Sequence, residues 1–239
     1  MVQIKLDEST HNQTEGLRRL AQLPIQIKDK SVLTLGFNEN WWMQDQEGRR
    51  LQIDFDENRK DYWRTHRGSG EPLARALGYK EGVRKVVDLT AGLAIDAVLL
   101  ARIGFQVMAV ERNPLVYFLL SEALLKAQRQ DLQGLQFHFG NALNYLEQID
   151  ISQPTSVYFD PMYPEKKKTA LSRKEMVMFR EIVGSDLDSE AVLNQSLKRS
   201  FHKIVVKRPF RAESISFSPD YALKTKLLRF DVYYPRGFS

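Results

Sequence analysis

The sequence predicts an α/β protein with a mostly parallel sheet, preceded by a small, mostly β N-terminal lobe. Two observations predict this class. From residue 84 onward, short apolar runs alternate with longer segments of helical spacing, a pattern typical of parallel strands joined by crossover helices. The first 60 residues instead contain two runs with the alternating polarity of strands. We therefore expect a lobe at 1–60 and a second domain at 61–239.

The composition is ordinary for a globular protein and excludes several kinds of site. Of the 239 residues, 43% are hydrophobic and 27% charged, and none is cysteine, which excludes disulfides and thiolate metal sites. No apolar run approaches the ~20 residues of a membrane span. The first residues lack the basic and apolar segments of a signal peptide, and the histidines show no ligand spacing. We expect a cytoplasmic protein with no membrane or metal partner and no implied stable protein partner.

In the N-terminal lobe, the alternating runs predict strands at 31–37 and 50–55. Trp41 and Trp42 lie between them, before a turn signal at Gln46–Gly48. We interpret the tryptophan pair as part of a core rather than as a platform for a ligand.

The connector at 61–82 ends in an expected helix at 73–77. Two glycines, two arginines and a histidine precede its first proline, Pro72. They form either an anion-binding helix N-terminus or an ordinary loop.

The larger domain begins with the strands of the parallel sheet. These strands are expected at 86–89, 105–110, 135–139, 157–159 and 203–207, with an antiparallel edge strand at 227–234. The helices are expected at 93–103, from Pro114 behind an Asn113 cap to about 128, from about 142, and at 187–200.

A candidate reacting group follows the fourth of these strands. Asp160, Pro161 and Tyr163 come where a strand of an open α/β sheet ends, which is where such sheets bind ligands. An exocyclic amine of a nucleobase is a poor nucleophile because it is conjugated with its ring. The Asp160 carboxylate and a backbone carbonyl held by Pro161 would accept its hydrogens, and Tyr163 would stack on the base. The alternative is a strand-end aspartate with a proline-rich turn.

A candidate cofactor site lies in the first strand–turn–helix. Asp88 lies in the strand expected at 86–89, Gly92 allows a close backbone approach, and Glu111 ends the next strand, 19 residues after Gly92. An acid at this position hydrogen-bonds ribose hydroxyls in nucleotide-binding α/β folds. Asn141, after the third strand, is placed to face an adenine.

The ligand favoured by this pattern has no phosphate. Ala94 and Ala97 occupy the later glycine positions of the dinucleotide fingerprint, and Asp96 in the first helical turn would repel phosphate. S-adenosylmethionine has a ribose, an adenine and a positive sulfur, so it fits better than a nicotinamide dinucleotide.

Three stretches, 86–96, 109–114 and 158–164, resemble class I methyltransferases. More narrowly, the sequence from about His66 almost to the C-terminus resembles the RsmJ-type family, which methylates the exocyclic N2 of a guanosine in small-subunit (16S) ribosomal RNA. The resemblance implies a Rossmann-like fold with a central, mostly parallel seven-stranded sheet, S-adenosylmethionine as cofactor, and ribosomal RNA or the small ribosomal subunit as partner. Ala94 stands where the family usually has glycine, and a contact at Ile95 would use the backbone.

The residues expected to hold the donor are Asp88, Gly92, Ile95, Asp96, Glu111, Arg112, Gly140, Asn141 and Asp160. The segment from Pro161 to Arg211 has 12 Lys and Arg against 6 Asp and Glu, which suits a phosphate backbone or, alternatively, a solvated lysine face. The residues expected to contact RNA are Arg67, Lys166, Lys167, Lys168, Arg173, Lys207 and Arg208.

Two other functions remain open at this point. One is the same chemistry on a DNA adenine or a protein side chain. The other is a non-catalytic RNA-binding module in which Ala94 marks a lost pocket. A dehydrogenase is a more distant third.

Overall fold

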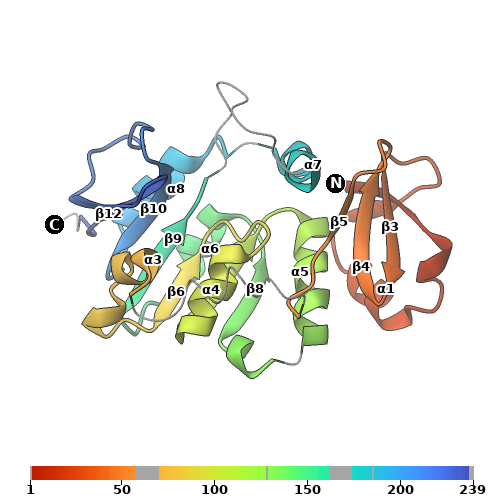
Figure 1. Ribbon diagram of the computed structural model, residues 1–239, viewed down its shortest axis with the longest axis horizontal. Coiled ribbons are helices and arrows are strands. Elements are labelled where there is room, and N and C mark those ends of the chain that lie inside the picture. The colour runs from red at the N-terminus through yellow and green to blue at the C-terminus, as the bar shows by residue number, and fades with distance from the viewer. Residues whose placement is uncertain (1, 57–69, 128, 162–173, 185, 237–239) are drawn as a thin grey trace. The chain divides into compact units, whose positions relative to one another are not determined.

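The computed structural model describes residues 2–56, 70–127, 129–161, 174–184 and 186–236 (Figure 1). The chain forms two compact units. The first contains the described residues of 2–56, 113–127 and 174–184, and the second those of 70–112, 129–161 and 186–236. The domain boundary predicted near residue 60 falls outside the described residues and stays a prediction.

The second unit is built on a seven-stranded sheet of order β11-β12-β10-β9-β6-β7-β8. Its strands are β6 (Lys85–Asp88), β7 (Gln106–Glu111), β8 (Leu135–Phe139), β9 (Thr155–Phe159), β10 (Ile204–Pro209), β11 (Tyr221–Lys224) and β12 (Leu228–Tyr233). The neighbours from β8 to β10 pair in parallel, and β12 pairs antiparallel with β10 and β11. The predicted, mostly parallel seven-stranded sheet is confirmed. The strand expected at the edge, 227–234, is instead internal, because β11 pairs with its outer side.

Helices cover both faces of this sheet. They are α3 (Pro72–Ala76), α4 (Ile95–Ile103), α6 (Ala142–Gln148) and α8 (Ser189–Leu197), with the 3-10 turns η2 (Tyr79–Glu81) and η3 (Gln130–Leu132). Successive side chains of a strand point to opposite faces. Ser156 and Tyr158 of β9 bond to the chain just after α3 and to α4, whereas Val157 belongs to a core cluster with Leu146 of α6 and Leu193 of α8. Burial on both faces explains why the last three residues of β9, 157–159, carry large apolar or aromatic side chains.

The first unit contains a separate five-stranded sheet of order β2-β1-β3-β4-β5. Its strands are β1 (Val2–Leu6), β2 (Ile25–Ile27), β3 (Leu33–Asn38), β4 (Asn40–Asp45) and β5 (Arg50–Gln52), and its helices are η1 (Glu8–Thr10), α1 (Thr14–Leu20), α5 (Pro114–Ala127) and α7 (Lys174–Val183). The two predicted strands correspond to β3 and β5. Asn113 caps α5 as predicted, because its Oδ1 accepts the N–H groups of Leu115 and Val116 at 3.0 and 3.2 Å.

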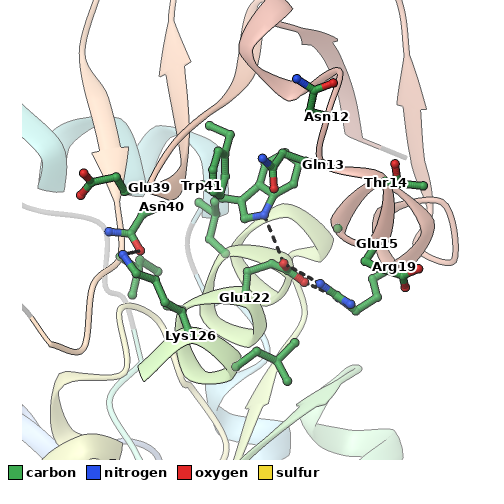
Figure 2. A pocket seen from close by; sticks show the side chains of 16 residues that line it. Asn12, Gln13, Thr14, Glu15, Arg19, Glu39, Asn40, Trp41, Glu122 and Lys126 are labelled. Atoms are coloured by element: carbon green, nitrogen blue, oxygen red, sulfur yellow. Dashed lines mark hydrogen bonds and ion pairs between the residues drawn. The ribbon is translucent and has the colours of Figure 1, made fainter. Parts of the chain in front are cut away.

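Both tryptophans lie in β4 and are buried in the first unit, as predicted. The Trp41 ring packs edge-on against Phe118 of α5, and its Nε1 donates to Glu122 at 3.1 Å. Arg19 of α1 also pairs with Glu122, at 2.5 Å, beside a pocket of about 430 Å³ (Figure 2). Gly36 is required by this packing, since a Cβ there would lie 2.0 Å from the Trp42 ring. In the described part of the chain, no helix has the length and apolarity needed to cross a membrane.

Candidate active site

The site predicted from sequence lies where the strand order of the second unit reverses. The chain runs from β6 to β7 and β8 on one side, then returns to β9 and β10 on the other. Open α/β sheets bind ligands at the carboxyl ends of the strands at such a switch point. Asp88, Glu111 and Asp160 come at or directly after the ends of β6, β7 and β9, and Lys207 lies on β10.

Asp88 is buried at the end of β6. Its Oδ1 accepts the N–H of Thr90 at 3.0 Å. Burial raises the pKa of the Asp88 carboxyl to about 7, against the Thr90 hydrogen bond and with further upward contributions from Asp96 and Asp160. The group therefore changes its protonation state near neutral pH.

The turn between β6 and α4 uses the left-handed backbone conformation twice. Gly92 has φ +55° and Ala94 has φ +56°. The Gly92 N–H donates to Glu111 Oε2 at 3.1 Å, so the acid that ends β7 fixes the turn after β6. Ala94 is fully buried, and a side chain in this conformation costs about 1–3 kcal/mol. This conformation explains why glycine suits position 94, and it shows that alanine keeps the turn formed.

An ion-paired chain connects α4, β9 and β10. Asp96 Oδ2 accepts from the Tyr158 hydroxyl at 2.5 Å and from Lys207 Nζ at 2.7 Å. The same Lys207 Nζ lies 3.0 Å from Asp160 Oδ2. Burial opposes the charge on Lys207, but Asp96 and Asp160 outweigh it and raise its pKa, so it remains an ammonium. Burial, with the same carboxylates, keeps the pKa of Tyr158 well above its ordinary value, so its hydroxyl remains a donor.

Asp160 lies at the end of β9 and is accessible to solvent. Its backbone N–H donates to Thr90 Oγ1 at 2.8 Å, and 43% of its side chain is exposed. The protein around the carboxyl still raises its pKa by desolvation, against the attraction of Lys207 and with the repulsion of Asp96. Pro161 follows and is buried. Asp160 is thus tied to the first turn without being enclosed in the core.

The residues expected on the adenine side are grouped at the ends of β7 and β8. The Gly140 N–H donates to the Glu111 carbonyl at 3.0 Å. Asn141 caps α6, because its Oδ1 accepts the Leu143 N–H at 2.7 Å, so a contact to adenine would use its amide nitrogen. Arg112 pairs with Asp186 at 2.8 Å, which holds its guanidinium toward the start of α8.

The residues expected to contact RNA have different outcomes. Those outside the described residues are Arg67, Tyr163 (expected to stack on the base), Lys166, Lys167, Lys168 and Arg173. Lys207 lies between two carboxylates, and Arg208 is buried with its guanidinium donating to the Glu213 carbonyl. Both placements leave little access to an RNA phosphate.

Sequence reasoning missed two participants, Thr90 and Tyr158. A threonine two residues after Asp88 is a recognisable turn-forming signal. Tyr158 is harder to find, because it lies in an apolar run and its partner Asp96 is 62 positions away.

The charge of the site suits a cationic ligand without phosphate. The carboxyl groups of Asp88, Glu111 and Asp160 lie at these strand ends and that of Asp96 in the first turn of α4, together with the Lys207 ammonium. A sulfonium and an ammonium group would complement them, and ribose hydroxyls would meet Glu111. Within the described ranges, no group of three such acids or histidines is arranged to hold a metal ion.

Comparisons with known proteins agree with this chemistry. A family model described as "Putative SAM-dependent methyltransferase" matches residues 18–235. The chain is 43% identical over 197 residues to "Ribosomal RNA small subunit methyltransferase J" of Bdellovibrio bacteriovorus. The matched region covers 82% of this chain and 78% of that protein. A protein of the same name from Pseudomonas aeruginosa is 36% identical over 234 residues, covering 92% and 90%. The chain belongs to this family.

Family membership confirms the predicted fold and chemistry. The crystal structure of a SAM-dependent methyltransferase from Neisseria gonorrhoeae superposes with a TM-score of 0.76 at 28% identity, covering 100% of this chain and 98% of that one. The chain is a methyltransferase of the α/β class, and S-adenosylmethionine is its methyl donor. A dehydrogenase is excluded.

Proposed function

We propose that this protein methylates the exocyclic N2 of a guanosine in small-subunit ribosomal RNA. The observation that supports this proposal best is the position of Asp160, at the switch point of the sheet and held by Lys207 and Thr90. The methyltransferase J relatives are named for small-subunit ribosomal RNA, which supports the substrate class. Such a substrate implies work in the cytoplasm, where ribosomes assemble.

The donor would be held by residues from three strand ends and from the first turn of α4. Asp88 and Asp96 would face its cationic groups, Glu111 its ribose, and Gly140 and Asn141 its adenine. The bound donor supplies a methyl group on a positively charged sulfur. The preformed bond from Gly92 to Glu111 keeps the turn in place before binding, which lowers the entropy lost on binding.

Asp160 would act on the acceptor amine. Its Oδ2 is engaged by Lys207, so Oδ1 would accept the amine hydrogens and orient the nitrogen lone pair. As positive charge develops on the nitrogen, the same carboxylate would stabilise it and take one proton. Alignment of the reactants is a large part of what such a site contributes.

Lys207 would serve this step as a positioning residue. Its ammonium holds the carboxylates of Asp96 and Asp160 at fixed positions and opposes the desolvation that favours a protonated Asp160. Tyr163 would stack on the extruded base, and Lys166, Lys167, Lys168, Arg67 and Arg173 would contact phosphates, making binding dependent on salt.

The structure bears differently on the two rival functions. A non-catalytic module with a lost pocket is disfavoured because Ala94 adopts the conformation of the glycine it replaces and the turn is intact. Methylation of a DNA adenine or a protein side chain needs the same Asp160 chemistry, so the distinction requires an assay of acceptors.

That assay measures transfer of labelled methyl groups to isolated small ribosomal subunits, naked small-subunit RNA, duplex DNA and protein. We expect label in the RNA, recovered as N2-methylguanosine after digestion, and none with Asp160→Asn. Label only in DNA or protein would overturn the substrate. No label in any acceptor, together with no binding of S-adenosylmethionine by calorimetry, would overturn the enzyme assignment.

A further inference from the structure

A second group of residues at the same edge of the sheet has no role in the chemistry above. Phe210 follows β10, and Leu227 precedes β12; the Phe210 N–H donates to the Leu227 carbonyl at 3.0 Å. The Phe210 side chain is 42% exposed and that of Leu227 79% exposed. Two neighbouring large apolar side chains therefore face solvent.

Exposed cations surround this pair. Arg211 follows Phe210, Lys224 ends β11, and Lys226 lies in the turn between β11 and β12. We call Phe210, Arg211, Lys224, Lys226 and Leu227 the rim patch. Glu213 is an exposed acid close in sequence. Because it is one acid against the three cations Arg211, Lys224 and Lys226, this part of the surface keeps a net positive charge.

The backbone that presents the rim patch is well fixed. Arg229 donates to the Phe210 carbonyl at 3.2 Å and pairs with the buried Asp231 at 2.7 Å. The Thr225 N–H closes the β11–β12 turn on the Leu228 carbonyl at 2.8 Å. These bonds fix the backbone at Phe210 and at the β11–β12 turn before RNA binds.

The strand register places the rim patch beside the active site. Val206 of β10 pairs with Phe159 of β9, so Lys207 is level with Asp160. Phe210 lies three residues further along the same direction, about 10 Å at the rise of a strand. Pro209 pairs with Leu228, and Lys224 pairs with Arg229, which brings the β11–β12 turn to this same edge.

We propose that the rim patch binds the single-stranded RNA that flanks the target guanosine. This inference rests on the proposed function and names the part of the substrate recognised outside the reacting centre. A base would stack on Phe210, with Leu227 against its edge, and phosphates would meet Arg211, Lys224 and Lys226. Exposed aromatic side chains within a positive surface are the combination that binds single strands, and the charge favours RNA over an apolar protein partner.

The test compares two patch variants with a charge-matched control. The patch variants are Phe210→Ala and the triple variant R211Q/K224Q/K226Q. The control, R75Q/K80Q/K198Q, removes three exposed cations from α3, η2 and the end of α8, away from the rim patch. For each protein we would measure the dissociation constant for an RNA fragment containing the target, at several salt concentrations, the affinity for S-adenosylmethionine, and KM for RNA.

We expect Phe210→Ala to weaken RNA binding roughly 5- to 150-fold, the loss of about 1–3 kcal/mol for one stacked base. The triple variant should lower the salt slope of RNA binding by about 2, since each phosphate contact to a single strand contributes about 0.7. The control should differ little from wild type, and donor affinity should be unchanged in all variants.

The possible failures are distinguishable. Wild-type RNA affinity and KM in both patch variants, with methylation intact, would overturn the rim patch alone. A loss confined to assembled subunits, with naked-RNA affinity unchanged, would show that the patch contacts a ribosomal protein, which also overturns the RNA proposal. Absence of methyl transfer to any RNA by the wild-type protein would overturn the proposed function instead.

Discussion

Replacing Lys207 by methionine should change the pH dependence of methyl transfer rather than RNA binding. The ammonium lies 2.7 Å from Asp96 Oδ2 and 3.0 Å from Asp160 Oδ2. An opposite charge at such a distance lowers a carboxyl pKa by about 1–3, and the exposure of Asp160 places the effect at the lower end of that range. Without the ammonium, the pKa of Asp160 rises further, and that of Asp88 moves in the same direction.

Because an ionised Asp160 accepts the amine hydrogens, the acid limb of kcat/KM should move up by about one pH unit. At a pH below the acid limb, where the rate follows the ionised fraction of Asp160, the variant should transfer methyl groups roughly tenfold more slowly than wild type, and the difference should shrink as the pH rises above the limb. The assay is transfer of a labelled methyl group across the pH range for wild type, Lys207→Met and Lys207→Arg. Arginine keeps the charge, so its acid limb should match that of wild type. An unmoved acid limb in Lys207→Met, combined with weaker RNA binding, would refute this reasoning and assign Lys207 to a phosphate.

Three further predictions concern the donor side of the site. Burial raises the pKa of Asp88 to about 7 from an unfolded value of about 3.9, so its favourable contribution to stability is fully present below pH ~4 and is lost as pH rises through 7. Asp88→Asn should therefore have a larger free energy of unfolding than wild type at alkaline pH, by up to the order of 4 kcal/mol, and a higher melting temperature. This difference should vanish near pH ~4, and a difference independent of pH would contradict the reasoning. Ala94→Val should cost at least about 2 kcal/mol in urea unfolding, because a β-branched residue is forced to φ +56°, whereas Ala94→Gly should change stability by less than about 1 kcal/mol; equal costs would refute the strain. Glu111→Ala should weaken S-adenosylmethionine binding at least about tenfold by calorimetry, because Gly92 and the ribose lose an acceptor, while Glu111→Gln should retain part of the affinity; unchanged binding in Glu111→Ala would exclude this role.

The parallel core of the second unit could be predicted from sequence because its information is local. Strands buried on both faces, such as β9, appear as runs that are largely apolar, and a helix end such as Gly104 is marked by residue type, as is the Asn113 cap of α5 in the first unit. β11 was missed because its four residues have no strong pattern, and its place at the edge follows from pairing with β12. β4 was missed because both Trp41 and Trp42 are buried, so no alternation marks the strand.

The candidate site was predictable as a set of strand-end acids, but its internal connections were not. The order glycine turn, acid, polar residue and Asp-Pro-x-Tyr follows the chain, so the sequence contains it directly. The pairing of Lys207 with Asp96 joins residues 111 positions apart and depends on the register of β10 beside β9. The sequence showed only a lysine in a basic segment, which suggested an RNA phosphate. A similar long-range contact, Trp41 with Glu122, joins α5 to the N-terminal sheet within the first unit.

The most direct test of the central proposal is mapping N2-methylguanosine in small-subunit ribosomal RNA. The RNA would come from cells that lack this protein and from the same cells supplied with the wild-type chain or with Asp160→Ala at equal abundance. We predict that one guanosine carries the N2-methyl group with the wild-type chain and lacks it both without the protein and with Asp160→Ala. Full methylation with Asp160→Ala, or an identical methylation map in all three strains, would contradict the role assigned to this carboxylate and its RNA substrate.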